Sequence, residues 1–462
     1  MAERTIGGLP LRVAMLYVVL GLASLAAYGI LWPDAPAIDG DSSQYMEVAR
    51  DLRDFHIDEI HDRAPGYPAL LALTGSGDAP TRSLFRASLL LHFGSVWLLA
   101  LALHATGAST RALTAFGILL TLPPYVEPAG YVMTENLAQF TLAAGLTGLV
   151  MWLAYRRRAW LVAASLAFAV AGLTRPTYQL LAIAIAATLV LLPSLGRRLG
   201  LVFRDALTGA IVLALGSIVI LGGLCWRNQV TFGYFGVAPT FGLHLSTKTM
   251  SFVERLPDEY SVAREILVRE RNVLLTRPGG THDGTQTIWH AREELSKALG
   301  LSTPELSKYL VKMNLRLIAQ APLEYLDEVG RAYAAYWFPA SGPLAAMNSP
   351  ILRWSWVLLH LIVLAVFFVQ LTVAVGITAL EMTRTTSGVV LSVLSLPVAA
   401  YLLAGGIFLY TLLLSCFLDI GEPRQRRPTD VLIVFMCFLG LQLWRSYLSR
   451  YNVKSSMRDS SV

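Results

Sequence analysis

The sequence is poor in charged residues and in cysteine. Only 15% of its 462 residues are charged, whereas 55% are hydrophobic, and soluble proteins carry roughly 25% charged residues. The balance excludes an ordinary soluble domain and indicates a multispan membrane protein. The three cysteines lie in or at the end of apolar segments and form no CxxC pair, so no disulfide framework is predicted.

Paired metal-binding histidines are also missing. We treat the following histidines as surface or capping residues because none shows HExxH or other paired spacing: His56, His61, His244, His282 and His290. The net charge of +6 comes largely from short loops between apolar runs. It predicts orientation in a membrane, with lipids as partners, and no nucleic-acid partner.

The long apolar runs predict ten membrane spans. They cover residues 11–32, 84–105, 112–125, 134–154, 160–174, 178–193, 207–226, 353–380, 388–418 and 429–446. We expect the first to be an uncleaved anchor with the N-terminus in the cytoplasm, which places most arginine-rich loops inside. The run 388–418 exceeds one ordinary span, and Pro397 or Gly405-Gly406 would be the points of a break. We predict one tilted or kinked helix there.

Four parts follow from this topology. A membrane module (1–226) contains an external loop at 33–83. A mostly helical extracytoplasmic insert (227–352) precedes three further spans within 353–446 and a basic cytoplasmic tail (447–462). The external side also receives the segment from Glu127 to Glu135, the turn at Arg175 and a GEPRQRRP loop. Nearly all candidate chemistry is therefore expected on the extracytoplasmic face of a cytoplasmic (inner) membrane.

The external loop opens with an acid at the head of an amphipathic helix. Apolar side chains recur at helical spacing at Tyr45, Val48, Ala49, Leu52 and Phe55. The pattern predicts a helix lying on the membrane surface with its apolar side down.

Two acids have alternative interpretations. Asp41 is either the N-cap of this helix or a functional carboxylate at the boundary of water and lipid. Glu135 is either an acid favoured by the dipole of a first helical turn, or a residue that orients an acceptor.

Four short motifs occur in order on the predicted external side. They are Asp41 and Tyr45 followed by Arg63-Ala-Pro-Gly-Tyr-Pro68; Met133-Thr-Glu-Asn-Leu137; Trp226-Arg-Asn228 with Phe232-Gly233; and Gly421-Glu-Pro-Arg-Gln-Arg-Arg-Pro428. Together they resemble membrane glycosyltransferases of the GT-C fold, and within it the bacterial protein-mannosyltransferase and lipid A aminoarabinose-transferase group. The resemblance covers most of the sequence. It implies an all-α multispan fold with interfacial helices in the first external loop and a small external helical insert.

The resemblance also implies a reaction and a set of site residues. The donor would be a sugar on a polyprenyl phosphate, displaced with inversion by an extracytoplasmic acceptor hydroxyl. Asp41 would be the general base, with Glu135 as a second catalytic acid. The arginines expected to bind the leaving phosphate are Arg424, Arg426 and Arg427, then Arg227 and Arg175. Residues expected to shape the substrate site are Asp39, Tyr45, Arg63 and Tyr67.

One position departs from the family pattern. Gln425 stands where the family often has a tyrosine, which leaves open which arginine takes the phosphate. Arginines 424–427 also suit lipid headgroups, and Arg227 suits a snorkelling role at the end of a span.

No cofactor is predicted, although Asp41 and Glu135 would hold a divalent ion if one is used, as in the oligosaccharyltransferase type of GT-C enzyme. Asp39-Gly-Asp41 spells the DxD of nucleotide-sugar transferases, but that chemistry belongs on the cytoplasmic side.

The main alternative function is a transporter or lipid flippase. Such proteins place ionisable groups near the bilayer midplane and show internal repeats. Here the charged residues gather at the outer rim, which favours surface chemistry. A glycan ligase is a further alternative, but such enzymes tend to lack an acid after the first span.

Overall fold

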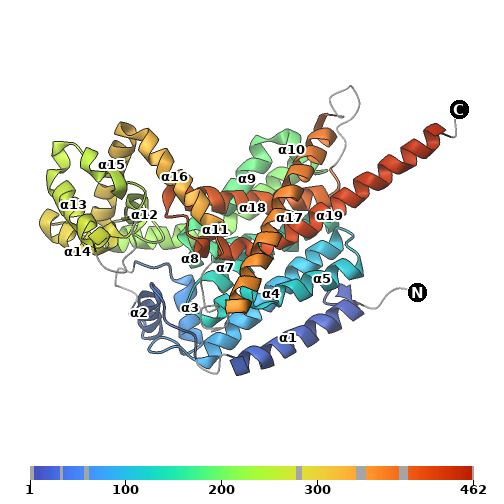
Figure 1. The fold of residues 1–462 in the computed structure, drawn as a ribbon, viewed down its shortest axis with the longest axis horizontal. Coiled ribbons are helices and arrows are strands. Elements are labelled where there is room, and N and C mark those ends of the chain that lie inside the picture. The colour runs from blue at the N-terminus through green and yellow to red at the C-terminus, as the bar shows by residue number, and fades with distance from the viewer. Residues whose placement is uncertain are drawn as a thin grey trace.

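The computed structural model describes residues 5–31, 35–56, 62–276, 284–339, 350–383 and 394–459, and these are mostly helical (Figure 1). His61 and His282 lie outside the described residues. Seven helices are long and apolar enough to span a membrane: α1 (Leu11–Leu31), α4 (Arg82–Ala105), α7 (Glu135–Tyr155), α11 (Phe203–Phe232), α17 (Pro350–Thr383), α18 (Leu396–Leu418) and α19 (Pro423–Asp459). The prediction of an all-α multispan membrane protein is confirmed.

Three predicted spans correspond to shorter apolar helices, α5 (Thr110–Leu120), α8 (Arg158–Thr174) and α9 (Leu181–Leu191). The 11 residues of α5 rise only about 16 Å, so α5 alone does not cross a ~30 Å core. The expected continuation to residue 125 is wrong. Pro123 and Pro124 cannot continue the helix, and the chain turns into α6 (Pro123–Val126) and η1 (Glu127–Gly130).

The long apolar run near 388–418 contains one ordinary helix. Residues 388–393 lie outside the described residues, and α18 begins at Leu396 with Pro397 in its first turn, where the missing N–H of proline costs little. Gly405 and Gly406 lie within the helix without ending it. The helix has 23 residues, so the predicted tilt or kink is not needed to explain its length.

The last helix begins earlier and ends later than predicted. Residues 423–428, expected in a loop, form the first turns of α19, and residues 447–459, expected in a tail, continue the same helix. Pro423 suits a helix start because its nitrogen would have no helical partner there. The arginines of the GEPRQRRP segment are therefore fixed on a helix head rather than on a loop.

Helix α7 is the centre of the bundle. It packs against α4 and α8, and its apolar window is 78% buried, the largest share among the seven candidate spans of the described chain. At Gly148 a side-chain Cβ would stand 2.7 Å from the carbonyl oxygen of Trp160. The glycine thus permits the close helix contact that membrane interiors favour.

Between α11 and α17 the chain builds a separate helical insert. Its elements are α12 (Phe241–Ser246), η3 (Met250–Arg255), η4 (Asp258–Tyr260), α13 (Ser261–Thr276), α14 (Thr287–Leu299), α15 (Thr303–Gln320) and α16 (Pro322–Tyr336). Its own core includes Leu267, Ile288, Leu310 and Met313.

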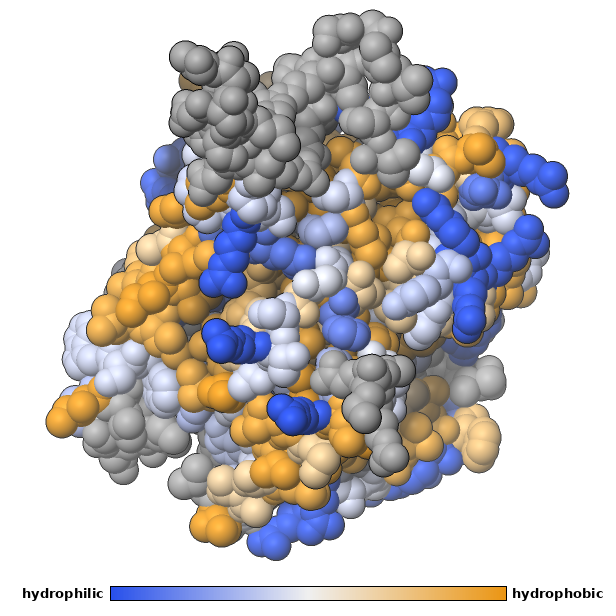
Figure 2. All heavy atoms as spheres, turned by 90° about the vertical axis from the view of Figure 1, so that its right-hand side faces the viewer, coloured by the Kyte–Doolittle hydropathy of each residue, from blue (hydrophilic) through white to orange (hydrophobic). Residues whose placement is uncertain are grey.

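The insert shares one end of the molecule with the first loop. Figure 1 shows α12–α15 on the same side as α2 (Ser42–Arg53) and α3 (Gly66–Leu73), away from both chain ends. Arg292 of α14 pairs with Asp62 of the first loop. The opposite side, which carries the chain ends, shows polar side chains scattered over an apolar surface (Figure 2).

The apolar stripe of α2 faces protein, not lipid. Tyr45 and Ala49 are buried in a cluster with Tyr67 and Leu71 of α3. The prediction of a helix lying apolar side down on a membrane is therefore wrong for most of the stripe. Phe55, beyond the helix end, is the exception, with 85% of its surface exposed.

Arg426 fastens α19 to the end of α16. The side chain is 1% exposed and donates to Asp430 Oδ1 (2.7 Å), to the carbonyl oxygen of Phe338 (3.1 Å) and to that of Tyr336. Arg426→Ala would leave these acceptors unpaired. We expect it to lower the free energy of unfolding by about 3 kcal/mol.

The buried free cysteines Cys225, Cys416 and Cys437 supply the measurement, because a thiol-reactive dye reports their exposure during heating in detergent. Arg426→Ala should lower Tm, whereas Arg445→Ala, at an exposed position of α19, should not. Equal Tm values for the two variants would contradict the structural role.

Candidate active site

The Asp41 carboxylate binds two arginines. Asp41 occupies the N-cap position of α2, but its side chain makes no capping hydrogen bond. Its Oδ1 accepts from Arg63 Nη2 at 2.5 Å and its Oδ2 from Arg424 Nη2 at 3.1 Å. The carboxylate is therefore not used as a helix cap.

Glu135 shares one of these arginines. It is the first residue of α7 and is 2% exposed. Its Oε1 accepts from Arg424 Nε at 3.0 Å and lies 3.6 Å from Arg175 Nη1. Charges thus alternate along Arg63, Asp41, Arg424, Glu135 and Arg175, and we call these five residues the ion-pair network.

Local sequence brings the members of the network together. Helix α8 ends at Thr174 because Arg175 precedes Pro176, and Arg175 adopts the extended backbone that a following proline imposes. Ser42 joins the head of α2 to the segment before α7: its hydroxyl donates to the carbonyl oxygens of Asp39 (2.6 Å) and Val132 (2.9 Å). Four of the five network residues therefore lie at or next to helix ends.

Electrostatics keep Asp41 ionised. Burial alone would raise the pKa of its carboxyl group, but the positive charges of Arg63 and Arg424 outweigh burial and lower that pKa below its ordinary value. A carboxylate held in this way accepts a proton poorly at neutral pH. Its strongest effect in this state is to fix the two guanidinium groups.

Buried polar atoms without partners surround Glu135. They are Glu135 Oε2, both amide atoms of Asn136, Arg175 Nη1 and the Tyr67 hydroxyl. Burial raises the pKa of Tyr67 well above its usual range, so its hydroxyl stays protonated. Such atoms are normally satisfied by protein, water or ligand. The cluster thus offers donors and acceptors for a polar molecule beside the network.

Of the three arginines predicted from the GEPRQRRP segment, Arg424 alone pairs with Asp41 and Glu135. Arg427 donates to Glu127 Oε1 at 3.1 Å, and that carboxylate is 4% exposed. Arg426 is buried in the contacts that fasten α19 to α16. The prediction that Arg426 binds a donor phosphate is not supported by this geometry.

Two further predicted residues, Arg227 and Asp39, make no contact with the ion-pair network among the hydrogen bonds and ion pairs of the described chain. Arg227 lies in α11, donates to Asn228 Oδ1 at 3.3 Å and stacks over Phe232 at 5.2 Å, apart from the network contacts. The Asp39 side chain is exposed, and its backbone, not its carboxylate, binds Ser42.

The predicted aromatic residues lie beside the network. Arg63 stands 5.2 Å over the Tyr45 ring, and Tyr45 meets Tyr67 edge to face at 5.4 Å. The two rings therefore pack the protein side of the site.

The site does not fit a divalent ion between its carboxylates. Arg424 already bridges Asp41 and Glu135, and the described residues contain no group of three His, Cys, Asp or Glu side chains that could hold one. Ca²⁺ prefers six or more oxygen ligands, and Mg²⁺ an octahedral set. Asp41 and Glu135 are therefore joined through Arg424 and not arranged around a metal ion.

Sequence reasoning missed a histidine that lies close to the network. His244 of α12 places its Nδ1 3.2 Å from Oδ2 of Asp419, the residue that follows α18. The partners are far apart in sequence, and no short motif joins them. The one available clue was that Asp419 stands just before Gly421, where the last motif begins.

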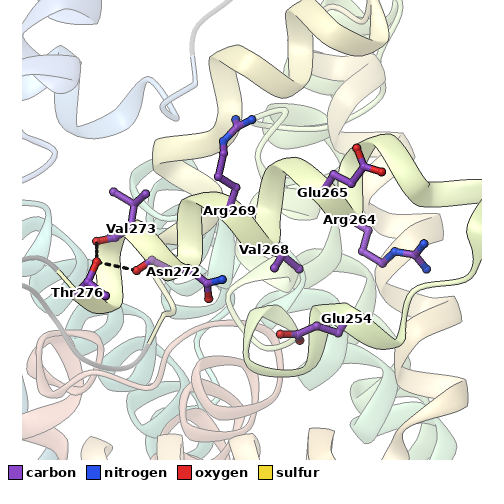
Figure 3. A pocket seen from close by; sticks show the side chains of 8 residues that line it. All are labelled: Glu254, Arg264, Glu265, Val268, Arg269, Asn272, Val273 and Thr276. Carbon is purple, nitrogen blue, oxygen red and sulfur yellow. Dashed lines mark hydrogen bonds between the residues drawn. The ribbon is translucent and has the colours of Figure 1, made fainter.

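A shallow groove lies elsewhere on the insert. Its volume is ≈ 750 Å³, and it is lined by Glu254, Arg264, Glu265, Val268, Arg269, Asn272, Val273 and Thr276. Figure 3 shows these side chains on α13 and the preceding η3. None belongs to the ion-pair network, so the candidate chemistry is assigned to the network and not to the groove.

Comparison with known proteins identifies the fold. No known family model matches the sequence, and no curated protein matches it. Among solved structures, the archaeal oligosaccharyltransferase AglB from Archaeoglobus fulgidus, in complex with an inhibitory peptide and a dolichol-phosphate, is similar with a TM-score of 0.52. That match has 12% identity and covers 97% of this chain and 52% of that one. The apo form of the oligosaccharyltransferase from the same organism is similar with a TM-score of 0.51 and 12% identity. That match covers 96% of this chain and 52% of that one.

The chain spans about half the length of these structures. At 12% identity the similarity establishes the fold, and the prediction of a GT-C-like membrane fold is confirmed. The bacterial branch named from the motifs stays a prediction.

A glycine brings the first loop against the Arg175 turn. At Gly66 a Cβ would stand 2.7 Å from the carbonyl carbon of Leu173 and 2.9 Å from the nitrogen of Thr174. Gly66→Ala must therefore push α3 and the Arg63 loop away from Arg175. We expect a cost of about 1–3 kcal/mol and a loss of activity.

The same thermal assay, combined with a turnover measurement, checks this prediction. Gly222→Ala is the matched control because no atom lies within 4 Å of its built Cβ. Equal stability and turnover for both variants would show that the contact at Gly66 is unimportant.

Proposed function

We propose that this chain is an inverting glycosyltransferase that moves a sugar from a polyprenyl-phosphate carrier to an extracytoplasmic acceptor hydroxyl. The observation that carries the proposal is Arg424, fixed between Asp41 and Glu135 at one end of a GT-C-like fold. The similar AglB structure holds a dolichol-phosphate and a peptide, which supports a polyprenyl-phosphate carrier and a separate acceptor. The location proposed for the site is the outer face of the cytoplasmic membrane.

The arginines keep donors to spare for a phosphate. Arg424 uses Nε and Nη2 for the two carboxylates, so Nη1 takes part in neither of these two hydrogen bonds. Arg175 Nη1 has no hydrogen-bond partner. When the bond between sugar and phosphate breaks, the leaving phosphate gains negative charge, and these preorganised donors stabilise it.

The alternative of a transporter is less well supported. Four of the five charged residues of the network lie at or next to helix ends, whereas transporters usually carry ionisable groups near the membrane midplane. The GT-C-like fold points the same way.

Consumption of a donor tests the proposal directly. The purified protein is mixed with a panel of polyprenyl-phosphate sugars and an envelope extract that supplies acceptors. Asp41→Asn frees Arg424 and Arg63 from their charged partner, so we expect kcat/KM to fall at least about 100-fold.

Asp54→Asn is the control, since Asp54 belongs to the same loop but forms only an exposed pair with Arg53. A folded protein that consumes no donor would overturn the proposal and turn attention to lipid transport. Activity of Asp41→Asn within about threefold of the parent would remove Asp41 from the site.

The phosphate assignment has its own test. Arg424→Ala should raise the donor KM by about 10-fold or more, because hydrogen bonds to charged groups contribute about 1.5–3 kcal/mol. Arg424→Lys should recover part of this, since lysine keeps the charge but not the planar fork. Arg424→Ala alone leaves the buried Glu135 carboxylate without this partner. The double variant Arg424→Ala/Glu135→Gln removes that charge as well and is therefore the control. An unchanged KM, with an increase in Arg227→Ala instead, would move the phosphate site to Arg227.

A further inference from the structure

The insert contributes a histidine–carboxylate pair next to the ion-pair network. His244 belongs to α12, and Asp419 follows α18 at the start of the segment that leads to α19. His244 Nδ1 is buried and lies 3.2 Å from Asp419 Oδ2, while 33% of the imidazole side chain is exposed. Nδ1 therefore faces Asp419 at ion-pair distance, without a hydrogen bond of good geometry, and we take Nε2 as the ring nitrogen that would meet a substrate.

The carboxylate that orients the ring is itself held in place. Asp419 Oδ1 accepts from the backbone N–H of Ile420 at 2.9 Å. Burial alone would raise the pKa of Asp419, but His244 and the backbone contact outweigh it and lower that pKa, so the group stays ionised. Trp289 of α14 meets the imidazole edge to face at 5.3 Å. These contacts restrict the position of the ring, and the ionised Asp419 next to Nδ1 favours a proton on that nitrogen.

The pair lies within electrostatic reach of the network. The charge of His244 is among those that lower the pKa of Asp41, and the charge of Arg175 is among those that lower the pKa of Asp419. Asp41 therefore interacts electrostatically with His244, and Asp419 with Arg175.

We propose that His244, positioned by Asp419, is the proton acceptor for the acceptor hydroxyl, while Asp41 positions Arg63 and Arg424. The inference rests on the proposed function and deepens it. As the acceptor oxygen bonds to the anomeric carbon, its proton passes to Nε2 of His244. The bond from that carbon to the phosphate oxygen breaks, its electron pair stays on the phosphate, and the carrier leaves as polyprenyl phosphate beside Arg424.

The occupancy of Asp41 is the reason for this division of roles. Both Asp41 oxygens accept hydrogen bonds from guanidinium groups, and the lowered pKa that results makes the carboxylate a weaker base toward a hydroxyl. Moreover, withdrawing Arg424 from Asp41 would also remove a partner of the buried Glu135. His244 needs no such rearrangement.

The pH dependence separates the two candidate bases. Imidazole is the side chain that changes charge between about pH 5 and pH 8. The charged groups that face His244 are Asp419 and, across the site, Asp41; α14 presents Trp289, and α15 contacts α12 through the uncharged Asn314. A histidine base therefore predicts a loss of activity toward acidic pH, whereas Asp41, with its lowered pKa, stays ionised over this range.

The experiment measures kcat/KM for a consumed donor from pH 5 to pH 8 in the full-length protein. The parent should lose activity as the pH falls. His244→Gln should lose about 100-fold or more at pH 7.5 and have no acid limb, with little change in the donor KM. His290→Gln, at an exposed position of α14, should keep the parent profile.

Two further variants identify the roles. Imidazole added to His244→Ala should restore turnover, which a merely structural histidine would not show. Asp419→Asn should lower kcat and alter the acid limb while leaving the donor KM near that of the parent.

Turnover of His244→Gln within about threefold of the parent, with the acid limb intact, would overturn the assignment and return the base role to Asp41. This result presupposes donor consumption, so it is distinct from failure of the proposed function, in which no donor is consumed at all.

Discussion

The structure depends on one shared cation. Glu135 begins the most enclosed helix of the bundle and is 2% exposed, and an unpaired buried carboxylate costs several kcal/mol. Arg424 supplies the nearest opposite charge from the head of α19, and the same guanidinium reaches Asp41 at the head of α2. Satisfying Glu135 therefore draws three distant segments to one point. The convergence that stabilises the bundle also builds the site.

This constraint separates the tasks of the charged residues. Carboxylates that hold arginines in place preorganise positive charge for a leaving phosphate, but they are poor proton acceptors while they do so. The base that we propose, His244, comes from outside the ion-pair network and belongs to the insert. Under that proposal the insert is more than a surface for choosing an acceptor, because it carries one residue of the site. Tyr325 seats it from α16, donating to the carbonyl oxygen of Phe417 at 2.8 Å.

Hydropathy was sufficient to predict the fold class and most of the apolar helices, because membrane helices are recognised by their length and apolar composition. Proline position decided the rest: Pro123 ended one predicted span and Pro423 began a helix inside a predicted loop. Motif order led to Asp41, Glu135 and Arg424. It did not separate Arg424 from Arg426. Residues two apart point to different sides of a helix, but the segment was predicted as a loop, in which the two side chains could not be assigned to different sides. His244 was missed because its partner is distant in sequence, and periodicity carries no information on such contacts.

The arginines at the head of α19 also show why charge counts mislead at such a site. Their predicted position outside runs against the positive-inside bias, which a phosphate ligand would explain. In the structure Arg424, Arg426 and Arg427 each pair with a carboxylate, so the helix head is nearly neutral and needs no ligand to balance it. Affinity for a phosphate must then come from particular N–H groups left over after these pairs form. Arg175 Nη1 has no hydrogen-bond partner, and Arg424 uses only Nε and Nη2 on carboxylates, so these are the network residues that we propose for a phosphate. Arg426, which binds α16 and Asp430, belongs to the scaffold that positions the head of α19.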